Sequence, residues 1–271
     1  MGLKPGDKVA SWLTCDEFPE TLVLQMAAAR AGLHLLSIGE LAELEPALKE
    51  AKALFLSPWK TIDQHYRIDY VLKLVPEMRQ TYFGNVVKTQ NFPNLQHVIQ
   101  TSHTTIRGSL KMKQIPVYSY SESNPLHNFE VKGESPVFTY KDSTHTQESL
   151  TEFTKGLCEK LSLGPRDILI NALTHKLPLS FACATAPGLS GVKCLVTGRQ
   201  DPIAENNQQK AKALVISPDR AKLIQEPGEV EQLVVAATNQ EEIDLTHKLL
   251  QQKGVKPKEV ISINPVSLKE T

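Results

Sequence analysis

Cysteine is scarce in this sequence, and its four copies lie far apart, at Cys15, Cys158, Cys183 and Cys194. No two of them form a Cys-x-x-Cys pair, which argues against a zinc site and against a disulfide framework. We expect all four to be buried as small hydrophobic side chains in a protein of a reducing compartment, such as the cytosol or a matrix.

An excess of either charge is also missing, because 30 lysines and arginines balance 30 aspartates and glutamates. No global field therefore attracts nucleic acid or anionic lipid. The basic residues are scattered rather than interleaved with aromatic ones, which argues further against nucleic-acid binding. The hydrophobic content of 41%, with only 6% aromatic residues, is typical of a folded globular chain.

Long hydrophobic runs are absent. The longest mildly apolar run, 177–192, contains Pro187 and two glycines and is shorter than the roughly 20 residues of a membrane span. A Lys4-Pro5-Gly6-Asp7 turn follows almost directly on the first residue, leaving no room for a signal or transit peptide. We expect either that no such peptide exists or that the numbering begins after a peptide that has been removed by processing.

Short apolar runs alternate with amphipathic ones along the whole chain, which is typical of parallel βαβ units. Strands are expected at 9–13, 33–38, 53–56, 95–100, 137–140, 168–173, 193–196, 213–216, 231–237 and 259–263. Helices are expected between most of them, including a long helical stretch over 59–90, whereas 101–116 has a loop-like composition. The predicted fold class is α/β, with two tandem parallel-type lobes.

The best boundary between the lobes is a segment containing proline, serine and asparagine. We therefore expect a first lobe at 1–120, a linker at 121–134 and a second lobe at 135–271. Tyr118 and Tyr120 are expected to form a short strand before the linker.

Residues 135–145 attract attention because an apolar strand there runs into a short polar turn before a long amphipathic helix. In α/β proteins such a turn often holds nucleotide phosphates, provided that it is rich in glycine. This turn contains no glycine, and Asp142 adds negative charge. The segments on either side resemble those of a nucleotide site, but the turn that would bind the phosphates looks removed.

Several runs carry a family resemblance in order and spacing. They include Gly-Leu-Lys-Pro-Gly-Asp-Lys-Val-Ala at 2–10, Met-Ala-Ala-Ala-Arg-Ala-Gly at 26–32, Val-Pro-Glu-Met at 75–78, Phe-Pro-Asn-Leu-Gln-His-Val-Ile at 92–99, Leu-Ser-Gly at 189–191 and the run 210–224. In these scaffold positions nearly the whole chain resembles the N-terminal domain of adenylate-forming enzymes, specifically medium-chain-type acyl-CoA synthetases.

The chemical positions of that family are not matched. The resemblance implies a Ser/Thr/Gly-rich loop ending in Pro-Lys-Gly between the strand at 137–139 and Thr144-His145, but only residues 140–143 stand there. Lys141 is a poor substitute for the loop lysine, since most exposed lysines are simply solvated. Further on, Ala237-Thr238-Asn239 replaces the Gly-Gly-Ala that approaches adenine, and reads as an ordinary helix cap.

The end of the chain departs as well. The resemblance implies a magnesium-orienting glutamate after the last strand, where only Glu270 stands, and we expect it to be a solvated terminal residue. The sequence stops before the family's ribose-binding aspartate, its hinge and the C-terminal domain with its catalytic lysine. We therefore assign no catalytic, cofactor-binding or metal-binding residues and expect no cofactor.

Other motifs support no different chemistry. The eight histidines form no i,i+4 pair with a carboxylate of the kind found in metal helices. His175 is expected to be a hydrogen-bonded structural residue, with lining of an acyl pocket as the alternative. The Thr101–Thr105 run is expected to be a surface loop, and Ser190-Gly191 lacks a nucleophile elbow.

The resulting hypothesis is a catalytically inactive acyl-CoA synthetase-like protein, a pseudoenzyme that serves as a structural or accessory subunit of a larger protein complex. We expect the lobe ending at 263 to leave an apolar flank and an open sheet edge for other subunits. The resemblance leans toward mitochondrial fatty-acid enzymes, so the mitochondrion is the expected location and the cytoplasm the alternative. The alternative functions are an acyl-CoA or fatty-acid binding protein, or a residually active ligase.

Overall fold

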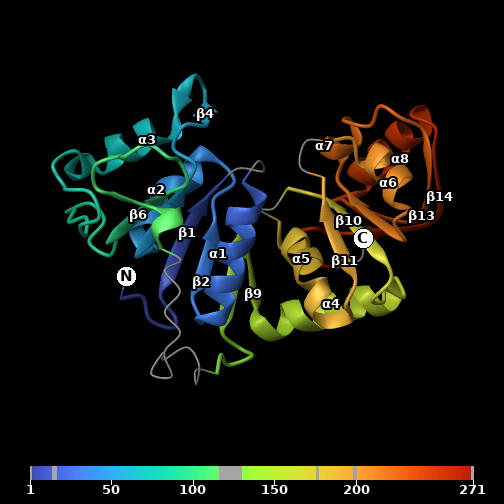
Figure 1. Cartoon of the computed structure of the whole chain (residues 1–271), viewed down its shortest axis with the longest axis horizontal. Coiled ribbons are helices and arrows are strands. Elements are labelled where there is room, and N and C mark those ends of the chain that lie inside the picture. Colours follow the sequence, from blue (N-terminus) through green and yellow to red (C-terminus); the bar gives the residue numbers. More distant parts are fainter. Residues whose placement is uncertain (1, 14–16, 116–129, 175–176, 198–199, 270–271) are drawn as a thin grey trace. The chain divides into compact units, whose positions relative to one another are not determined.

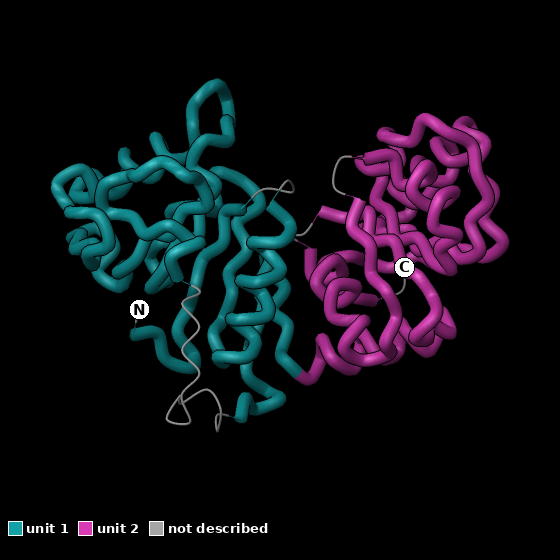
Figure 2. Tube along the Cα trace, viewed as in Figure 1, with its two compact units in different colours: residues 1–147 teal, residues 148–271 magenta. Residues whose placement is uncertain are grey.

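The structure is a computed structural model that describes residues 2–13, 17–115, 130–174, 177–197 and 200–269. It divides into two compact units, Met1–Gln147 and Glu148–Thr271 (Figure 2). Each unit contains a largely or wholly parallel sheet with helices (Figure 1), so the predicted α/β class is confirmed. Among the described residues no helix is long and apolar enough to cross a membrane.

Unit 1 is built on a seven-stranded sheet with the order β7-β6-β3-β1-β2-β8-β9. Its strands are β1 (Lys8–Trp12), β2 (His34–Ser37), β3 (Ala53–Leu56), β6 (His97–Gln100), β7 (Ser109–Lys111), β8 (Pro136–Tyr140) and β9 (Ser143–Thr146). All neighbours pair in parallel except β8 and β9, which are antiparallel. A separate hairpin joins β4 (Thr61–Ile62) to β5 (His65–Tyr66).

Both faces of this sheet are covered, which explains why its central strands read as continuous apolar runs. On one face, α2 (Leu44–Glu50), α3 (Arg67–Leu74) and the 3-10 turn η2 (Pro76–Arg79) form a core with Trp12 and Leu56. Alternate strand residues point to the opposite face. There α1 (Phe18–Arg30) packs Leu24 and Ala28 near Val9 and Phe55.

Unit 2 is a five-stranded parallel sheet with the order β11-β10-β12-β13-β14. Its strands are β10 (Ile168–Ala172), β11 (Lys193–Val196), β12 (Ala213–Ile216), β13 (Gly228–Ala236) and β14 (Val255–Ile263), and its helices are α4 (Gln147–Lys160), α5 (Pro178–Ser190), α6 (Pro202–Gln209), α7 (Pro218–Ala221) and α8 (Gln240–Gln252). Two apolar cores lie on opposite faces of the sheet. The neighbouring residues Leu169 and Ile170 belong to different cores because successive side chains of a strand alternate.

The division between the units differs from the expected one. Strand β8 pairs with β2, with Leu36 opposite Thr139, so the segment up to Gln147 belongs to the first sheet. Most of the expected linker at 121–134 lies outside the described residues, as do Tyr118 and Tyr120. The sequence marks β8 as a strand, but its choice of partner depends on which sheet edge is open.

Three further local predictions are wrong. The expected helix over 59–90 is a hairpin, the short helix α3, the turn η2 and an irregular loop. The expected loop over 101–116 contains β7 and the 3-10 turn η3 (Met112–Gln114). The strand β9 intervenes where the turn was expected to lead directly into α4. Each missed element is at most four residues long and contains no continuous apolar run, so no pattern marks it in the sequence.

The close contact of β7 with η2 depends on Gly108. This residue has a φ of +69°, and a Cβ added to it would lie 2.8 Å from Met78 Cα and 2.9 Å from Met78 O. Gly84, with a φ of +81°, has only an ordinary contact at 3.7 Å, to Leu110 Cδ2. The two glycines therefore share a left-handed backbone but differ in the space around them.

We predict that Gly108→Ala lowers the free energy of unfolding of unit 1 more than Gly84→Ala does. The matched control Gly84→Ala should cost about 1–2 kcal/mol for the left-handed backbone. Gly108→Ala should add about 1–3 kcal/mol for the overlap with Met78. Urea unfolding followed by tryptophan fluorescence measures this, since both tryptophans, Trp12 and Trp59, lie in unit 1. Equal losses would contradict the packing argument.

Candidate functional site

The turn between β8 and β9 occupies the position where the sequence suggested a lost nucleotide loop. Tyr140 pairs directly with Ser143, so Lys141 and Asp142 are the only residues of the turn. Lys141 has a φ of +52°, a left-handed conformation that tight hairpin turns require and that glycine or asparagine usually supplies. The strand therefore reverses at once, and no extended loop separates β8 from β9.

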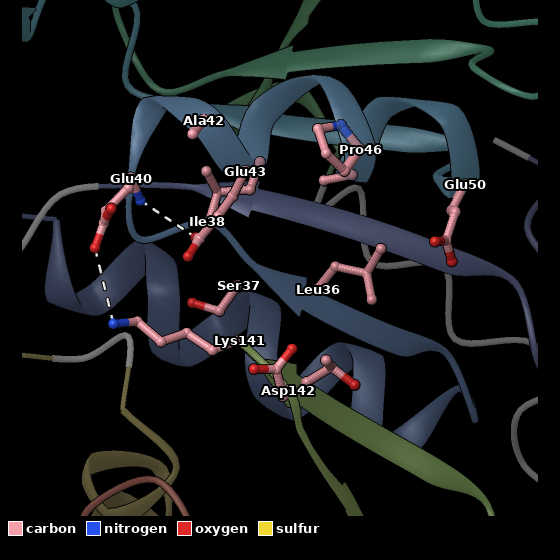
Figure 3. Close-up of a pocket in the computed structure, with 12 residues that line it drawn as sticks. Leu36, Ser37, Ile38, Glu40, Ala42, Glu43, Pro46, Glu50, Lys141 and Asp142 are labelled. Carbon is pink, nitrogen blue, oxygen red and sulfur yellow. Dashed lines mark hydrogen bonds and ion pairs between the residues drawn. The ribbon is translucent and has the colours of Figure 1, made fainter. Parts of the chain in front are cut away.

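An open groove of about 490 Å³ lies beside this turn, between the end of β2, the segment leading into α2, and the turn itself (Figure 3). The charged side chains that line it are one cation and four carboxylates, namely Lys141, Glu40, Glu43, Glu50 and Asp142. Such a lining repels a multiply charged anion, because like charges in a confined groove act additively.

The groups that could offset this repulsion are already occupied. The Lys141 ammonium lies 3.8 Å from the Glu40 carboxylate, as Figure 3 shows. The Glu43 carboxylate accepts hydrogen bonds from the backbone N–H groups of Gly39, at 2.6 Å, and Glu40, at 3.2 Å. These are the kind of backbone donors that bind phosphate elsewhere. The groove therefore offers an anion few free donors.

Tyr140 and Lys141 also have structural roles here. A Cβ added to Gly39 would lie 3.0 Å from the Tyr140 hydroxyl, so the Tyr140 ring packs directly against Gly39. Burial raises the pKa of Tyr140, against the opposing effect of Lys141. The Lys141 ammonium lies 5.8 Å from the centre of the Tyr140 ring. Lys141 thus contacts the protein's own tyrosine and glutamate.

Three side chains of neighbouring strands form a chain of hydrogen bonds that the sequence did not reveal. His34 Nε2 lies 2.6 Å from Thr139 Oγ1, which in turn lies 2.8 Å from Thr144 Oγ1. The three residues come from β2, β8 and β9, so only the strand order brings them together. Burial lowers the pKa of His34, and nearby Lys8 lowers it further, whereas Glu50 acts in the opposite direction.

The second position predicted to be degenerate lies in unit 2, at the start of α8. Asn239 Oδ1 accepts a hydrogen bond from the Glu242 N–H at 2.9 Å, which confirms the predicted helix cap. The Glu242 carboxylate in turn accepts from the Thr238 N–H at 2.6 Å and from its hydroxyl at 2.8 Å. Ala237 is fully buried. The helix N-terminus is therefore capped by its own side chains.

The three thiols among the described residues are packing groups. Cys158 and Cys183 are buried, as predicted, whereas Cys194 is only partly so. Burial raises the pKa of Cys194 to about 12 and that of Cys183 well above its usual range, so both are protonated and unreactive. Cys15 lies outside the described residues, as do His175 and Glu270, so their expected roles stay predictions.

The Thr101–Thr105 run forms a loop that is exposed from His103 onward. Its residues are engaged with neighbouring side chains: the Thr101 hydroxyl donates to Glu17, and the Trp59 indole donates to Thr104 at 2.9 Å. Within the described ranges no group of three or more histidine, cysteine or carboxylate side chains could hold a metal ion.

We predict that His34 makes unit 1 less stable in acid. Because its pKa is lowered on folding from an ordinary value of about 6.5, the unfolded chain binds the proton more readily. The free energy of unfolding should therefore fall as the pH drops below about 6.5 and be independent of His34 above it. Urea unfolding by tryptophan fluorescence should show a shallower pH dependence in His34→Gln. The exposed control His65→Gln should keep the original slope, and an unchanged slope in His34→Gln would contradict the assignment.

Comparison with known proteins gives a match in structure alone. No protein-family profile matches the sequence, and no curated protein resembles it in sequence. Among solved structures, a protein named as a long-chain-fatty-acid CoA ligase from Rhodopseudomonas palustris aligns with a TM-score of 0.67 at 13% identity, over 94% of this chain and 62% of that one. The N-terminal domain of FACL13 from Mycobacterium tuberculosis aligns with a TM-score of 0.66 at 15% identity, over 97% and 63%.

A third structure, a long-chain-fatty-acid-CoA ligase from Archaeoglobus fulgidus, aligns with a TM-score of 0.63 at 12% identity, over 96% of this chain and 53% of that one. The chain thus spans less than two thirds of the length of each of these structures. At such identities the likeness concerns the fold. Both units together have the fold of the N-terminal domain of acyl-CoA ligases, as the sequence resemblance predicted.

Proposed function

We propose that this chain is a degenerate relative of the adenylate-forming acyl-CoA synthetases that does not activate carboxylic acids. The fold likeness supports the relationship. The observation that carries the proposed loss of activity is the β8–β9 turn, in which only Lys141 and Asp142 separate Tyr140 from Ser143. A turn of two residues is too short to wrap around a triphosphate.

Electrostatics support the same proposal. Attack of a carboxylate on the α-phosphorus of ATP, with release of pyrophosphate, requires donors and cations preorganised around several negative charges. The groove beside the turn instead contains four carboxylates, and its one lysine is paired with Glu40. At the start of α8, Glu242 places another carboxylate on the Thr238 N–H. Both positions favour the protein's own contacts over those of a nucleotide.

We further propose that the protein acts as a structural or accessory subunit of a larger assembly, placed in the mitochondrion, with the cytoplasm as the alternative. Strand β14 supports a partner, since in the described part of the chain it pairs on one side only, with β13. Pro257 and two lysines blunt the first half of this edge. The second half lacks such residues, and Val260 is 37% exposed there.

An apolar cavity favours a second candidate, an acyl-chain binding protein. The cavity lies in unit 1 and measures about 210 Å³, and the described residues that line it, among them Leu24, Leu33 and Phe55, are all apolar. Apolar pockets of this kind suit apolar ligands. This candidate needs no nucleotide site and is compatible with an inactive turn.

We predict that magnesium and ATP leave the melting temperature of the protein unchanged. A ligand at a hundred times its dissociation constant would stabilise the fold by about 2.7 kcal/mol, which thermal shift readily detects. No fatty acid should give pyrophosphate release. A saturable shift with ATP that is lost in Lys141→Ala would overturn the proposed loss of activity. A shift with acyl-CoA but not with ATP would support the binding protein instead.

We also predict that the native protein co-elutes with a large complex in size-exclusion chromatography of cell extract. The chain expressed alone should aggregate, and Val260→Lys should reduce this by placing a charge on the open half of β14. Lys256→Ala, on the first half, is the control and should not. Elution of the native protein as a well-behaved monomer of about the 30.1 kDa chain mass would argue against the assembly.

A further inference from the structure

The balanced charge of the whole chain conceals a local separation of charge in unit 1. Residues 76–115 contain five lysines and arginines and a single carboxylate, Glu77. Four of the five cations are exposed and the fifth, Lys111, is partly exposed. Glu77 is thus outnumbered five to one, which leaves this stretch with an excess of positive charge.

The same stretch contains a loop, residues 80–86, that follows η2 and precedes β6. Three large apolar side chains in it are exposed: Tyr82 at 79%, Phe83 at 38% and Val86 at 46%. Arg79 and Lys88 flank the loop on either side and are both exposed. Isolated exposed apolar residues are common, but three within five positions form an exposed apolar patch of the kind that marks an interaction site.

Tertiary contacts join this loop to the basic residues near β7, which is the edge strand of the sheet. The Gly84 N–H donates to Ser109 O at 3.3 Å. Arg107 donates to Arg79 O at 3.4 Å, and the Lys111 ammonium lies 5.9 Å from the centre of the Phe83 ring. We call the resulting set the basic aromatic surface; it consists of Arg79, Tyr82, Phe83, Val86, Arg107 and Lys111.

The cations of this surface have no acidic partner among the described residues. Within the part of the chain that the structure describes, no carboxylate lies within ion-pair distance of Arg79, Arg107 or Lys111. Elsewhere several lysines are paired, for example Lys52 with Asp7 and Lys212 with Asp167. Unpaired cations around exposed aromatic side chains make the surface complementary to an anionic ligand that also accepts apolar groups.

We propose that the basic aromatic surface binds the surface of an anionic lipid bilayer. Tyrosine favours the headgroup region, where its ring is in an apolar environment and its hydroxyl is hydrated, and Phe83 and Val86 add exposed apolar side chains from the same loop. The three cations lie around them and attract anionic headgroups. A nucleic acid is less well matched, since the basic side chains of a nucleic-acid-binding protein would be expected to line a groove.

Sedimentation with lipid vesicles tests the proposal with the full chain. The protein should pellet with vesicles of phosphatidylcholine mixed with phosphatidylserine and not with phosphatidylcholine alone. Arg107→Ala and Lys111→Ala should each weaken binding about fivefold, the equivalent of ~1 kcal/mol per cation, and added salt should weaken it further. The double variant Tyr82→Ser, Phe83→Ser should abolish binding, while the fluorescence of Trp12 and Trp59 verifies that unit 1 remains folded.

Matched controls come from α8, where Leu245 is 42% exposed and Lys248 is exposed. Leu245→Ser and Lys248→Ala should leave vesicle binding unchanged. The proposal is overturned by equal binding to neutral vesicles, by equal losses in the controls, or by no binding to either vesicle. Binding to a duplex oligonucleotide in place of the vesicles, lost in Lys111→Ala, would assign the surface to nucleic acid instead.

Discussion

The reversal of the chain at Lys141 and Asp142 is the constraint on which the organisation of unit 1 depends. It turns β9 back along β8, so that the sheet gains an antiparallel edge strand beyond β2. The same reversal aligns Thr139 with Thr144, and the pairing of β8 with β2 brings Thr139 to His34. It also removes the space in which backbone amides could surround a phosphate. Extension of the sheet and the proposed loss of the nucleotide site are therefore consequences of one short turn.

Charge is distributed unevenly across this sheet although the chain as a whole is neutral. The groove with four carboxylates lies by β2 and β8, whereas the basic aromatic surface lies at β7, the strand at the opposite edge. The two regions are thus separated by the width of the sheet. A total charge cannot reveal this arrangement, because opposite charges cancel in the sum whatever their positions.

Elements with a continuous apolar, buried run were predictable from the sequence, and short elements without such a run were not. Parallel strands covered on both faces give continuous apolar runs such as 53–56 and 213–216, which the structure places in the centres of the two sheets. The stripe at 68–75 predicts part of a long helix, yet α3 ends at Leu74, and the 3-10 turn η2 and an irregular loop follow. Strand β7 has three residues and gave no recognisable pattern.

The sequence by itself determined the α/β alternation, the self-capped start of α8 and the absence of glycine at the turn after β8, because each depends on residues close together in the chain. Only the tertiary structure decided that β8 pairs with β2, that Glu43 occupies the backbone donors of Gly39 and Glu40, and that Lys111 lies over Phe83. These contacts join residues whose approach is set by sheet order and loop packing. A one-dimensional pattern carries no information on which strand edge, or which charge, a segment will meet.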